Sequence, residues 1–572
     1  MKVAQAISRA LVSEGVTLAA GIAGQSIWPV IDAIGDCEEV SLMYARQERV
    51  AFDICDGFAR ASGNPAVVFT DAGPAAANLM GGIVNSWGDS VPVLFLAGHN
   101  ERTRIASKFT KELPFLEIFA PVSKWSAMID DPSKVAETLR RAFMHLRTGR
   151  PGPVALGVPV DVAQMEVGNF EYQPVSPRPR VRSGADPDAI AAAIDLIGDA
   201  ERPYVYVGAG VLFSEATDEL VRFAELLTLP VATTLNGKSA FPEDHALALG
   251  IGGFGRASYG SLPATVLGES ADVILTVGCG FKQHATVVRP SQRTRHIQVD
   301  VDPTEVNRDH VADVAILGDA KVVLRQLAEA ARARLPAARL APVERRFKEL
   351  QELKARWASV CEPLLGSDET PINPFRVTRE FMKLVDPAQT IVLHDAGTVR
   401  GTTSQHYVAP RPRSFLGFGV QSAMGWSLGA AIGAKKAQPD KLVTAFIGEE
   451  ALNETAMDLE TSVRNNAPIL VIVKNNRKVP DQDGGKSKKL AVARFNQGVD
   501  ICALARALGT KAYRIEKPGD LARTLSAAIA DVRGGQTAVV EVMTARINGS
   551  LHHLWDPNAA GALTRSATPT NV

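Results

Sequence analysis

The 572-residue sequence lacks an excess of charge of either sign, since 62 lysines and arginines balance 62 aspartates and glutamates. It also lacks any dense acidic or basic block, which argues against nucleic acid or a charged membrane surface as the main partner. Its five cysteines are scattered without paired spacing, as is typical of a reducing compartment. No window approaches the ~20 apolar residues of a membrane helix, and residues 1–16 read as an amphipathic helix rather than a signal peptide. We therefore expect a cytoplasmic protein without membrane spans.

Short apolar runs alternate with helical stretches along nearly the whole chain, which favours a parallel α/β architecture. The chain is too long for one core, and its composition of 46% apolar and 22% charged residues is that of a globular protein. We expect three doubly wound parallel-sheet domains at residues 1–170, 186–335 and 371–545. A linker rich in proline and charge (residues 173–182) follows the first domain, and a charged helix (residues 342–360) precedes the third. Residues 546–572 form a tail that is either disordered or a flap ordered by ligand.

The segment from residue 446 to 476, FIGEEALNETAMDLETSVRNNAPILVIVKNN, is the most informative part of the chain. An apolar strand (residues 442–447) leads into Gly448-Glu449-Glu450 and an amphipathic helix, and a second strand (residues 469–473) ends at Asn475-Asn476. Parallel strands need a crossover helix, so both turns fall at the carboxyl edge of one sheet. There a carboxylate and an amide can share a cation, while free N–H groups at the helix start face an anion. A divalent metal that bridges a diphosphate would satisfy both ends.

This segment resembles the metal–diphosphate motif of thiamine-diphosphate-dependent enzymes, Gly-Asp-Gly followed about two dozen residues later by Asn-Asn. The resemblance implies that the Glu449 carboxylate, the Asn476 side-chain oxygen and the Lys478 carbonyl hold Mg²⁺. Because Glu replaces the family's Asp and lengthens the arm by roughly 1.5 Å, the more permissive Ca²⁺ is an alternative. The cofactor-binding turn spans Gly448, Glu449, Glu450 and Ala451.

Glu450 replaces the second glycine of the motif and places another carboxylate near the diphosphate. Like charges ~4 Å apart cost on the order of 4 kcal/mol at an effective dielectric near 20. We therefore expect this side chain to be paired or turned to solvent, and the alternative is a site that binds cofactor weakly or not at all.

The segment VSLMYARQERVAFDICDGFARASG places Glu48 at the start of a helix that follows a strand. It is similar to the family segment that carries the cofactor-activating acid, with Gln47 in place of the usual His. The resemblance implies that Glu48 protonates the pyrimidine ring nitrogen from a dry pocket, where the pKa of a carboxyl is raised. Taken without the resemblance, Glu48 is an N-terminal helix residue favoured by the macrodipole.

Two segments of the third domain also match the family. In GVQSAMGWSLGAAIGAKKAQPD (residues 419–440), the resemblance implies that Met424 wedges beneath the cofactor and forces its two rings into a V, while the Ser422 carbonyl and the Met424 N–H hold the pyrimidine edge. By itself Met424 would be core filler. In LHDAGTVRGTTSQHY (residues 393–407), a strand–turn–helix junction offers the N–H groups of Gly397, Thr398 and Val399 to the diphosphate.

Three further positions in the first domain are candidates on the substrate side. DAGPAAANL (residues 71–79) resembles the turn behind the pyrimidine pocket and places Asn78 near cofactor or substrate, although an outward amide at a helix start is the plain alternative. The resemblance also implies that Gln25, Ser26 and His99 handle protons in the substrate pocket. Each of these three could equally be a solvated loop residue.

The resemblance covers nearly the whole chain in the order pyrimidine-binding, central and diphosphate-binding domain. That order is typical of the group containing acetolactate synthase, pyruvate oxidase, benzaldehyde lyase, oxalyl-CoA decarboxylase and 2-hydroxyacyl-CoA lyase. It implies a thiamine-diphosphate-dependent C–C bond lyase or carboligase that acts on a 2-keto acid, a 2-hydroxy ketone (acyloin) or a 2-hydroxyacyl-CoA thioester. It also implies a homodimer or homotetramer with active sites between subunits. FAD or ADP is a further expectation for the central domain, where VGAGVLF (residues 207–213) looks like half of a dinucleotide fingerprint; the alternative for this segment is a tight strand-to-helix connection.

Three other readings stay open. One is a flavin-containing oxidase of the same group, and another is a CoA-thioester lyase whose tail closes over the acyl-CoA. The third is a non-catalytic or weakly cofactor-binding paralogue with a degenerate metal motif at Glu449-Glu450, which would use the fold as a binding module.

Overall fold

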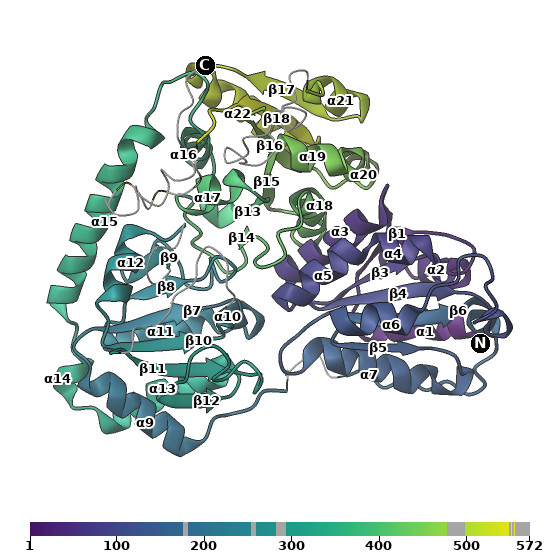
Figure 1. Cartoon of the computed structure of the whole chain (residues 1–572), viewed down its shortest axis with the longest axis horizontal. Helices are drawn as coiled ribbons and strands as arrows, with labels where there is room; N and C mark the ends of the chain where they lie inside the picture. The colour runs from purple at the N-terminus through teal and green to yellow at the C-terminus, as the bar shows by residue number, and fades with distance from the viewer. Residues whose placement is uncertain are drawn as a thin grey trace, which may run out of the picture.

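The computed structural model describes residues 1–175, 181–252, 259–281, 293–477 and 498–547, together with Gly549, Leu551 and Leu554. Its strands form three six-stranded sheets, and neighbouring strands in each sheet are parallel. Helices cover the sheets in three α/β units (Figure 1). This confirms the predicted fold class, while the residue boundaries between the domains stay predictions. Among the described residues, no helix combines the length and apolar character needed to cross a membrane.

The first domain is built on the sheet β2-β1-β3-β4-β6-β5. Its central strands are apolar and fully buried, as expected for a parallel sheet covered on both faces. The strands are β1 (Leu18–Ile22), β2 (Ser41–Tyr44), β3 (Ala66–Thr70), β4 (Val93–His99), β5 (Trp125–Met128) and β6 (Val154–Pro159). The helices are α1 (Val3–Ser13), α2 (Trp28–Gly35), α3 (Glu48–Ser62), α4 (Pro74–Asn78), α5 (Met80–Asp89), α6 (Phe115–Phe119), α7 (Val135–Arg147) and α8 (Val160–Gln164).

The central domain is built on the sheet β12-β11-β10-β7-β8-β9. Its strands are β7 (Pro203–Val207), β8 (Val231–Thr233), β9 (Ala248–Ile251), β10 (Val273–Val277), β11 (Arg295–Asp300) and β12 (Val314–Leu317). Its helices are α9 (Pro187–Asp199), α10 (Gly210–Phe213), α11 (Thr217–Leu227), α12 (Leu262–Glu269), α13 (Ala320–Arg334) and α14 (Ala337–Leu340). The long helix α15 (Glu344–Leu365), where a charged helix was predicted, connects this domain to the third.

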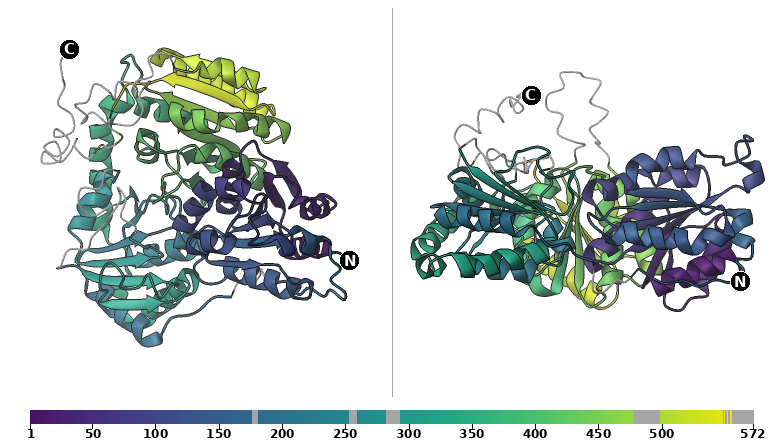
Figure 2. Two further views of the ribbon diagram at one scale, coloured as in Figure 1. Left: turned by 45° about the vertical axis from the view of Figure 1, so that its right-hand side comes forward. Right: turned by 90° about the horizontal axis from the view of Figure 1, so that it is seen from below.

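The third domain is built on the sheet β14-β13-β15-β16-β18-β17. Viewed from below, it stands between the central and the first domain (Figure 2). Its strands are β13 (Thr390–His394), β14 (Phe415–Leu416), β15 (Leu442–Gly448), β16 (Leu470–Asn475), β17 (Lys511–Ile515) and β18 (Ala538–Met543). Its helices are α16 (Pro374–Leu384), α17 (Thr398–Ser404), α18 (Trp426–Ala437), α19 (Glu449–Thr455), α20 (Leu459–Arg464), α21 (Ile501–Ala507) and α22 (Leu521–Arg533).

The first and third domains share one hydrophobic core, in which α3 packs along α18 (Figure 1). The two helices approach closely because glycines lie between them. A Cβ atom added to Gly433 would stand 1.8 Å from the carbonyl oxygen of Ile54, and one added to Gly57 would stand 2.2 Å from that of Ala430. The core therefore fixes the position of the first sheet relative to the third.

Candidate functional site

Glu48 lies at the carboxyl edge of the first sheet. It follows β2 and is the first residue of α3, whose N-cap Gln47 has an extended backbone. The side chain is half-buried, and its Oε2 accepts a hydrogen bond from Asn78 Nδ2 at 3.2 Å. Asn78 ends the short helix α4, which begins after Gly73 in a left-handed conformation (φ +65°). The structure thus brings together the two residues predicted for the pyrimidine side.

The turn that carries Glu48 is held against the third domain of the same chain. The backbone N–H of Arg46 donates to Asp458 Oδ1 at 2.8 Å, and Arg49 pairs with Glu454 at 3.3 Å. The Arg49 guanidinium also donates to the carbonyl of Met424. These contacts place Glu48 beside the predicted wedge and beside α19, the helix that follows the metal turn. The first and third domains therefore meet within one chain.

The loop with Ser422 and Met424 is organised by Asp395, a residue that the sequence analysis did not single out. Asp395 is fully buried and accepts hydrogen bonds from the N–H groups of Gly425 (2.9 Å) and Ser427 (2.8 Å). Ser422 adopts a left-handed conformation (φ +52°), and its hydroxyl accepts a hydrogen bond from Arg400 at 2.6 Å. A carboxylate directly after a buried strand was the available signal for Asp395.

The predicted diphosphate-binding turn follows β13. Gly397, the N-cap of α17, has φ +72°, and a Cβ added there would meet nothing within 4 Å. A Cβ added to Gly448, by contrast, would lie 3.8 Å from Val399 Cγ2. Since β13 and β15 are paired in parallel, α17 with Thr398 and Val399 stands directly beside the metal turn.

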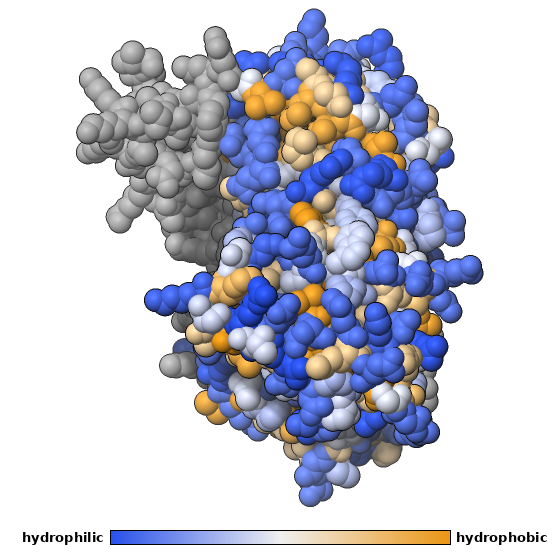
Figure 3. All heavy atoms as spheres, turned by 90° about the vertical axis from the view of Figure 1, so that its right-hand side faces the viewer, coloured by the Kyte–Doolittle hydropathy of each residue, from blue (hydrophilic) through white to orange (hydrophobic). Residues whose placement is uncertain are grey.

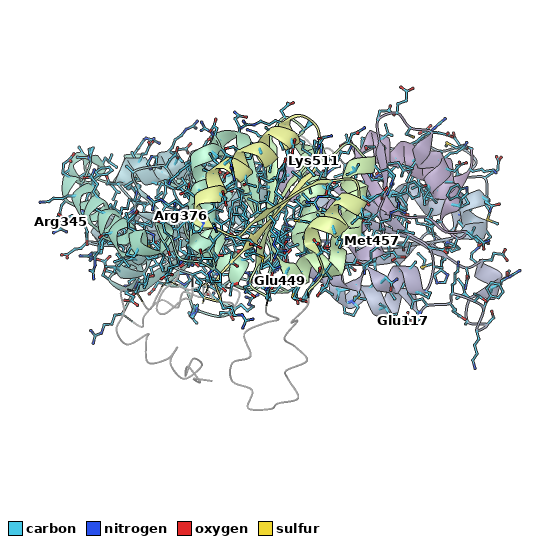
Figure 4. The ribbon with its side chains drawn as sticks, turned by 90° about the horizontal axis from the view of Figure 1, so that it is seen from above. Glu117, Arg345, Arg376, Glu449, Met457 and Lys511 are labelled. Carbon is cyan, nitrogen blue, oxygen red and sulfur yellow. The ribbon has the colours of Figure 1, made fainter. Side chains whose placement is uncertain are left out.

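Glu449 and Asn476 extend from neighbouring strands of the third sheet. Glu449 begins α19 after the N-cap Gly448 and is 8% exposed. Asn476 follows β16, which pairs with β15, and its buried Oδ1 has no hydrogen-bond partner among the described residues. In Figure 4, Glu449 appears between the labelled Arg376 and Met457 of the third domain. A buried amide oxygen without a donor beside a buried carboxylate fits a cation that prefers oxygen ligands.

Further residues shape the turn after Asn476. Arg477 has φ +54°, and its N–H donates to Asn475 Oδ1 at 2.9 Å. Asn475 Nδ2 in turn donates to Glu541 Oε1 at 2.7 Å. Arg546 donates to the carbonyls of Asn476 (3.1 Å) and Arg477 (3.0 Å). The predicted ligand Lys478 lies outside the described residues.

Protein side chains alone do not complete a metal site here. Among the described residues, no cluster of three His, Cys, Asp or Glu side chains could hold a metal ion. A cation at Glu449 and Asn476 would therefore need additional oxygens, such as those of a diphosphate. Glu450 is half-buried, and burial, then the negative charge of Glu454, raises the pKa of its carboxyl.

Of the candidate substrate-side residues, Gln25 and Ser26 follow β1, and His99 is the last residue of β4. Ser26 is buried, and both its N–H (3.0 Å) and its hydroxyl donate to Asp71 Oδ1. Gly98 stands so close that a Cβ added to it would lie 2.2 Å from Ser26 Oγ. His99 is buried, with Nε2 3.4 Å from the Leu113 carbonyl, and Nδ1 has no hydrogen-bond partner in the part of the chain that the structure describes. Gln25 is exposed.

A cavity of about 390 Å³ lies between the central domain and the two others. The glycine turn after β7 (residues 208–210) lines it. Gly208 and Gly278 approach closely there, since a Cβ on Gly208 would stand 2.1 Å from the Gly278 carbonyl oxygen. Asp300 also lines the cavity, and burial raises the pKa of its carboxyl to about 6. Other lining residues are Asn64, Arg150, Asn236 and Val420.

Comparisons with known proteins agree along the chain. Three family models match: thiamine pyrophosphate enzyme, N-terminal TPP binding domain (residues 1–118), central domain (190–327) and C-terminal TPP binding domain (395–542). The chain is 33% identical to the probable acetolactate synthase large subunit of Methanocaldococcus jannaschii, covering 92% of this chain and 90% of the relative. It is 28% identical to acetolactate synthase isozyme 3 large subunit of Escherichia coli K12 (96% and 95%) and 28% identical to glyoxylate carboligase of E. coli O157:H7 (96% and 94%). The chain therefore belongs to the thiamine pyrophosphate (thiamine diphosphate) enzymes, in the acetolactate synthase group.

Proposed function

We propose that the protein is a thiamine-diphosphate-dependent carboligase whose donor substrate is a 2-keto acid. One observation carries the proposal: the turn with Glu48 is held against Met424 and the helix of the metal turn. The names of the relatives, acetolactate synthase and glyoxylate carboligase, favour carboligation. A 2-hydroxy ketone or a 2-hydroxyacyl thioester is the alternative donor, cleaved in the lyase direction.

The residues of the first domain would control protons at the cofactor. When bound, thiamine diphosphate supplies a nucleophilic carbon that adds to a carbonyl and accepts the electron pair released by C–C cleavage. Glu48 would hold a proton at the pyrimidine ring nitrogen, with its carboxylate oriented by Asn78. Met424 would support the two rings, and the bond from Arg49 fixes its backbone. His99, with one ring nitrogen unpartnered, is the proposed proton carrier on the substrate side, with Gln25 at the same sheet edge.

The residues of the third domain would hold the diphosphate end. Glu449, Asn476 and the Lys478 carbonyl are the proposed ligands of Mg²⁺, with Ca²⁺ as the alternative ion. The N–H groups of α17 would bind phosphate oxygens. Because α17 lies next to Gly448 of the metal turn, these N–H groups and the metal could contact the same diphosphate. This arrangement neutralises the diphosphate charge from two sides.

The test compares E48Q with the exposed-site control E117Q. We expect E48Q to keep its thermal stability and its calorimetric affinity for thiamine diphosphate with Mg²⁺, while product formation from 2-keto acids falls about 10²–10⁴-fold. E117Q should match the wild type. Unchanged turnover in E48Q would refute the role of Glu48. Absence of binding heat in the wild type at millimolar cofactor would instead favour the non-catalytic paralogue.

We also propose that the central cavity binds a nucleotide such as FAD or ADP. The supporting observations are its volume and the close glycine turn that lines it. Nucleotide binding is measured by denaturing the protein with heat and identifying the released ligand by chromatography. The same measurement is made on protein that was first equilibrated with each nucleotide. A yellow protein that consumes O₂ would indicate the flavin oxidase. A tail that gains protease resistance with acyl-CoA would indicate the CoA-thioester lyase.

A homodimer or homotetramer remains our proposal for the assembly. Figure 3 shows apolar side chains among hydrophilic ones on the right-hand side of the molecule as drawn in Figure 1. Exposed apolar residues such as Trp28 and Trp87 would be covered in an oligomer. Sedimentation velocity at micromolar concentration tests this, and a monomer at all concentrations would exclude it. A cytoplasmic location is proposed because all five cysteines are free thiols.

A further inference from the structure

Lys474 is a buried lysine beside the metal turn. It directly precedes Asn475, the last residue of β16, and is 3% exposed. Its partner in the parallel pairing with β15 is Gly448. The backbone of Lys474 therefore stands next to both parts of the metal turn, the part that carries Glu449 and the part that carries Asn476.

The ammonium group of Lys474 is surrounded by threonines from two helices. Its Nζ lies 3.0 Å from Thr378 Oγ1 and from Thr402 Oγ1, and 3.1 Å from Thr403 Oγ1. The carbonyl of Thr402 is 3.3 Å away, and the ring centroid of Phe446 is 5.0 Å away. Thr378 belongs to α16, whereas Thr402 and Thr403 belong to α17, the predicted diphosphate-binding helix. The side chain of one strand residue thus ties α17 to β16.

The hydroxyl groups around Lys474 are oriented to accept from it. Thr378 Oγ1 donates its own proton to the Thr402 carbonyl at 2.8 Å, and Thr402 Oγ1 donates to the Val399 carbonyl at 3.4 Å. A hydroxyl that donates elsewhere presents its lone pairs to the ammonium, and such chains polarise one another. Two hydrogen bonds therefore connect Lys474 with Val399, whose N–H is a proposed donor to the diphosphate.

The burial of the Lys474 ammonium lowers the stability of the folded protein. A buried ammonium is normally paired with a carboxylate, yet in the described part of the chain the partners of Lys474 Nζ are hydroxyl and carbonyl oxygens, with no carboxylate among them. An apolar side chain of similar length would fill the position without this desolvation cost. The threonine cage therefore indicates a role beyond stability.

We propose that Lys474 is a positioning residue of the cofactor site, which fixes α17 against β16 so that the phosphate-binding N–H groups and the metal turn stay in register. The proposal rests on the proposed function, because it assigns Lys474 to the same diphosphate site. A diphosphate held by α17 on one side and by Glu449 and Asn476 through a cation on the other depends on the spacing between the two. Residues that orient ligands in this way typically change metal affinity or activity 10–100-fold when replaced.

The test is the affinity of K474M for thiamine diphosphate in the presence of Mg²⁺, measured by calorimetry well below the melting temperature. We expect Kd to rise about 10–100-fold, while kcat at saturating cofactor changes far less. The matched control is K238M/E243Q, because Lys238 is equally buried but bonds to Glu243 at 2.5 Å in the central domain. That control should shift the melting temperature without changing Kd, whereas a merely structural role of Lys474 would make both variants behave alike.

A milder variant keeps the test decisive if K474M does not fold. T403V has nearly the shape of the native residue and removes one of the oxygens around Nζ, so Kd should rise a few-fold with the fold intact. A folded K474M or T403V with the wild-type Kd would overturn the proposal. Failure of the wild type itself to bind thiamine diphosphate is a separate result, which would overturn the proposed function and with it this inference.

Discussion

The close packing of α3 on α18 makes the position of Glu48 sensitive to a single methyl group. A Cβ atom at residue 433 would lie 1.8 Å from the carbonyl oxygen of Ile54 and 2.8 Å from the amide nitrogen of Phe58. Ordinary van der Waals contact begins near 3.4 Å, so G433A must push the helices apart by about 1.6 Å, because backbone atoms on both sides cannot rotate away. Since α3 begins with Glu48, the displacement moves this acid away from Met424.

The displacement of α3 predicts that G433A loses both stability and catalytic rate. Overpacking a core costs typically ~1–3 kcal/mol, so we expect G433A to fold with a lowered melting temperature. A misplacement of about 1 Å in a catalytic group can cost roughly 10²-fold in rate, so kcat should fall on this order at saturating cofactor. Thermal unfolding and product formation from 2-keto acids measure the two effects separately.

Two other glycines turn the experiment into a graded series. A Cβ on Gly429 would lie 2.8 Å from Asp53 Cβ and 3.0 Å from the Val50 carbonyl, so G429A should lose only a few-fold of kcat. Gly519 lies on an exposed turn with nothing within 4 Å of an added Cβ, and G519A should match the wild type. A wild-type kcat in G433A, or a larger loss in G429A than in G433A, would refute the reasoning.

Two further predictions concern charge. Burial raises the pKa of Asp458 from 3.8 to about 6. Because the pKa in the folded state exceeds that in the unfolded state, the native protein binds an extra proton between about pH 4 and 6. Folding therefore loses about 3 kcal/mol of stability as pH rises through this window. D458N keeps an acceptor for the Arg46 N–H, so its melting temperature should vary less across this window, and an unchanged slope would contradict the assignment. E449D shortens the carboxylate arm by roughly 1.5 Å and should shift cofactor binding toward Mg²⁺ over Ca²⁺, as calorimetry with each ion would show; an unchanged ratio would exclude Glu449 as a ligand.

Local sequence patterns were sufficient to predict the strands and the strand-to-helix turns that carry the site residues. The apolar runs at residues 442–447 and 469–473 became buried strands within two residues of the predicted bounds, because a fully buried parallel strand needs no other signal. Glu48, Gly397 and Glu449 each lie at a strand-to-helix turn. Such turns fall at one edge of a parallel sheet, so the sequence places each residue at the carboxyl edge of its sheet.

Contacts between distant segments could not be predicted in the same way. Asp395 bonds to backbone groups about 30 residues away, and Arg49 reaches Met424 from another domain. Ser26 looked available for proton transfer in the sequence, but it is engaged by Asp71. These partners depend on which helix faces meet, and no periodicity in one segment encodes the facing residue of another.

The acidic turn Glu449-Glu450 is better understood together with Arg49 than as a defect of the metal motif. Glu450 and Glu454 lie one helical turn apart on α19, and Glu454 contributes to the raised pKa of Glu450. Arg49, with a side chain only 15% exposed, brings a cation from the first domain to Glu454 at 3.3 Å and to the Met424 carbonyl. The acidic helix α19 therefore reaches a positive charge next to the activating acid through Glu454, one turn beyond Glu450. The Arg49–Glu454 pair has side chains that are 15% and 41% exposed, so salt screens it and it adds only modestly to the contact between the two halves of the site.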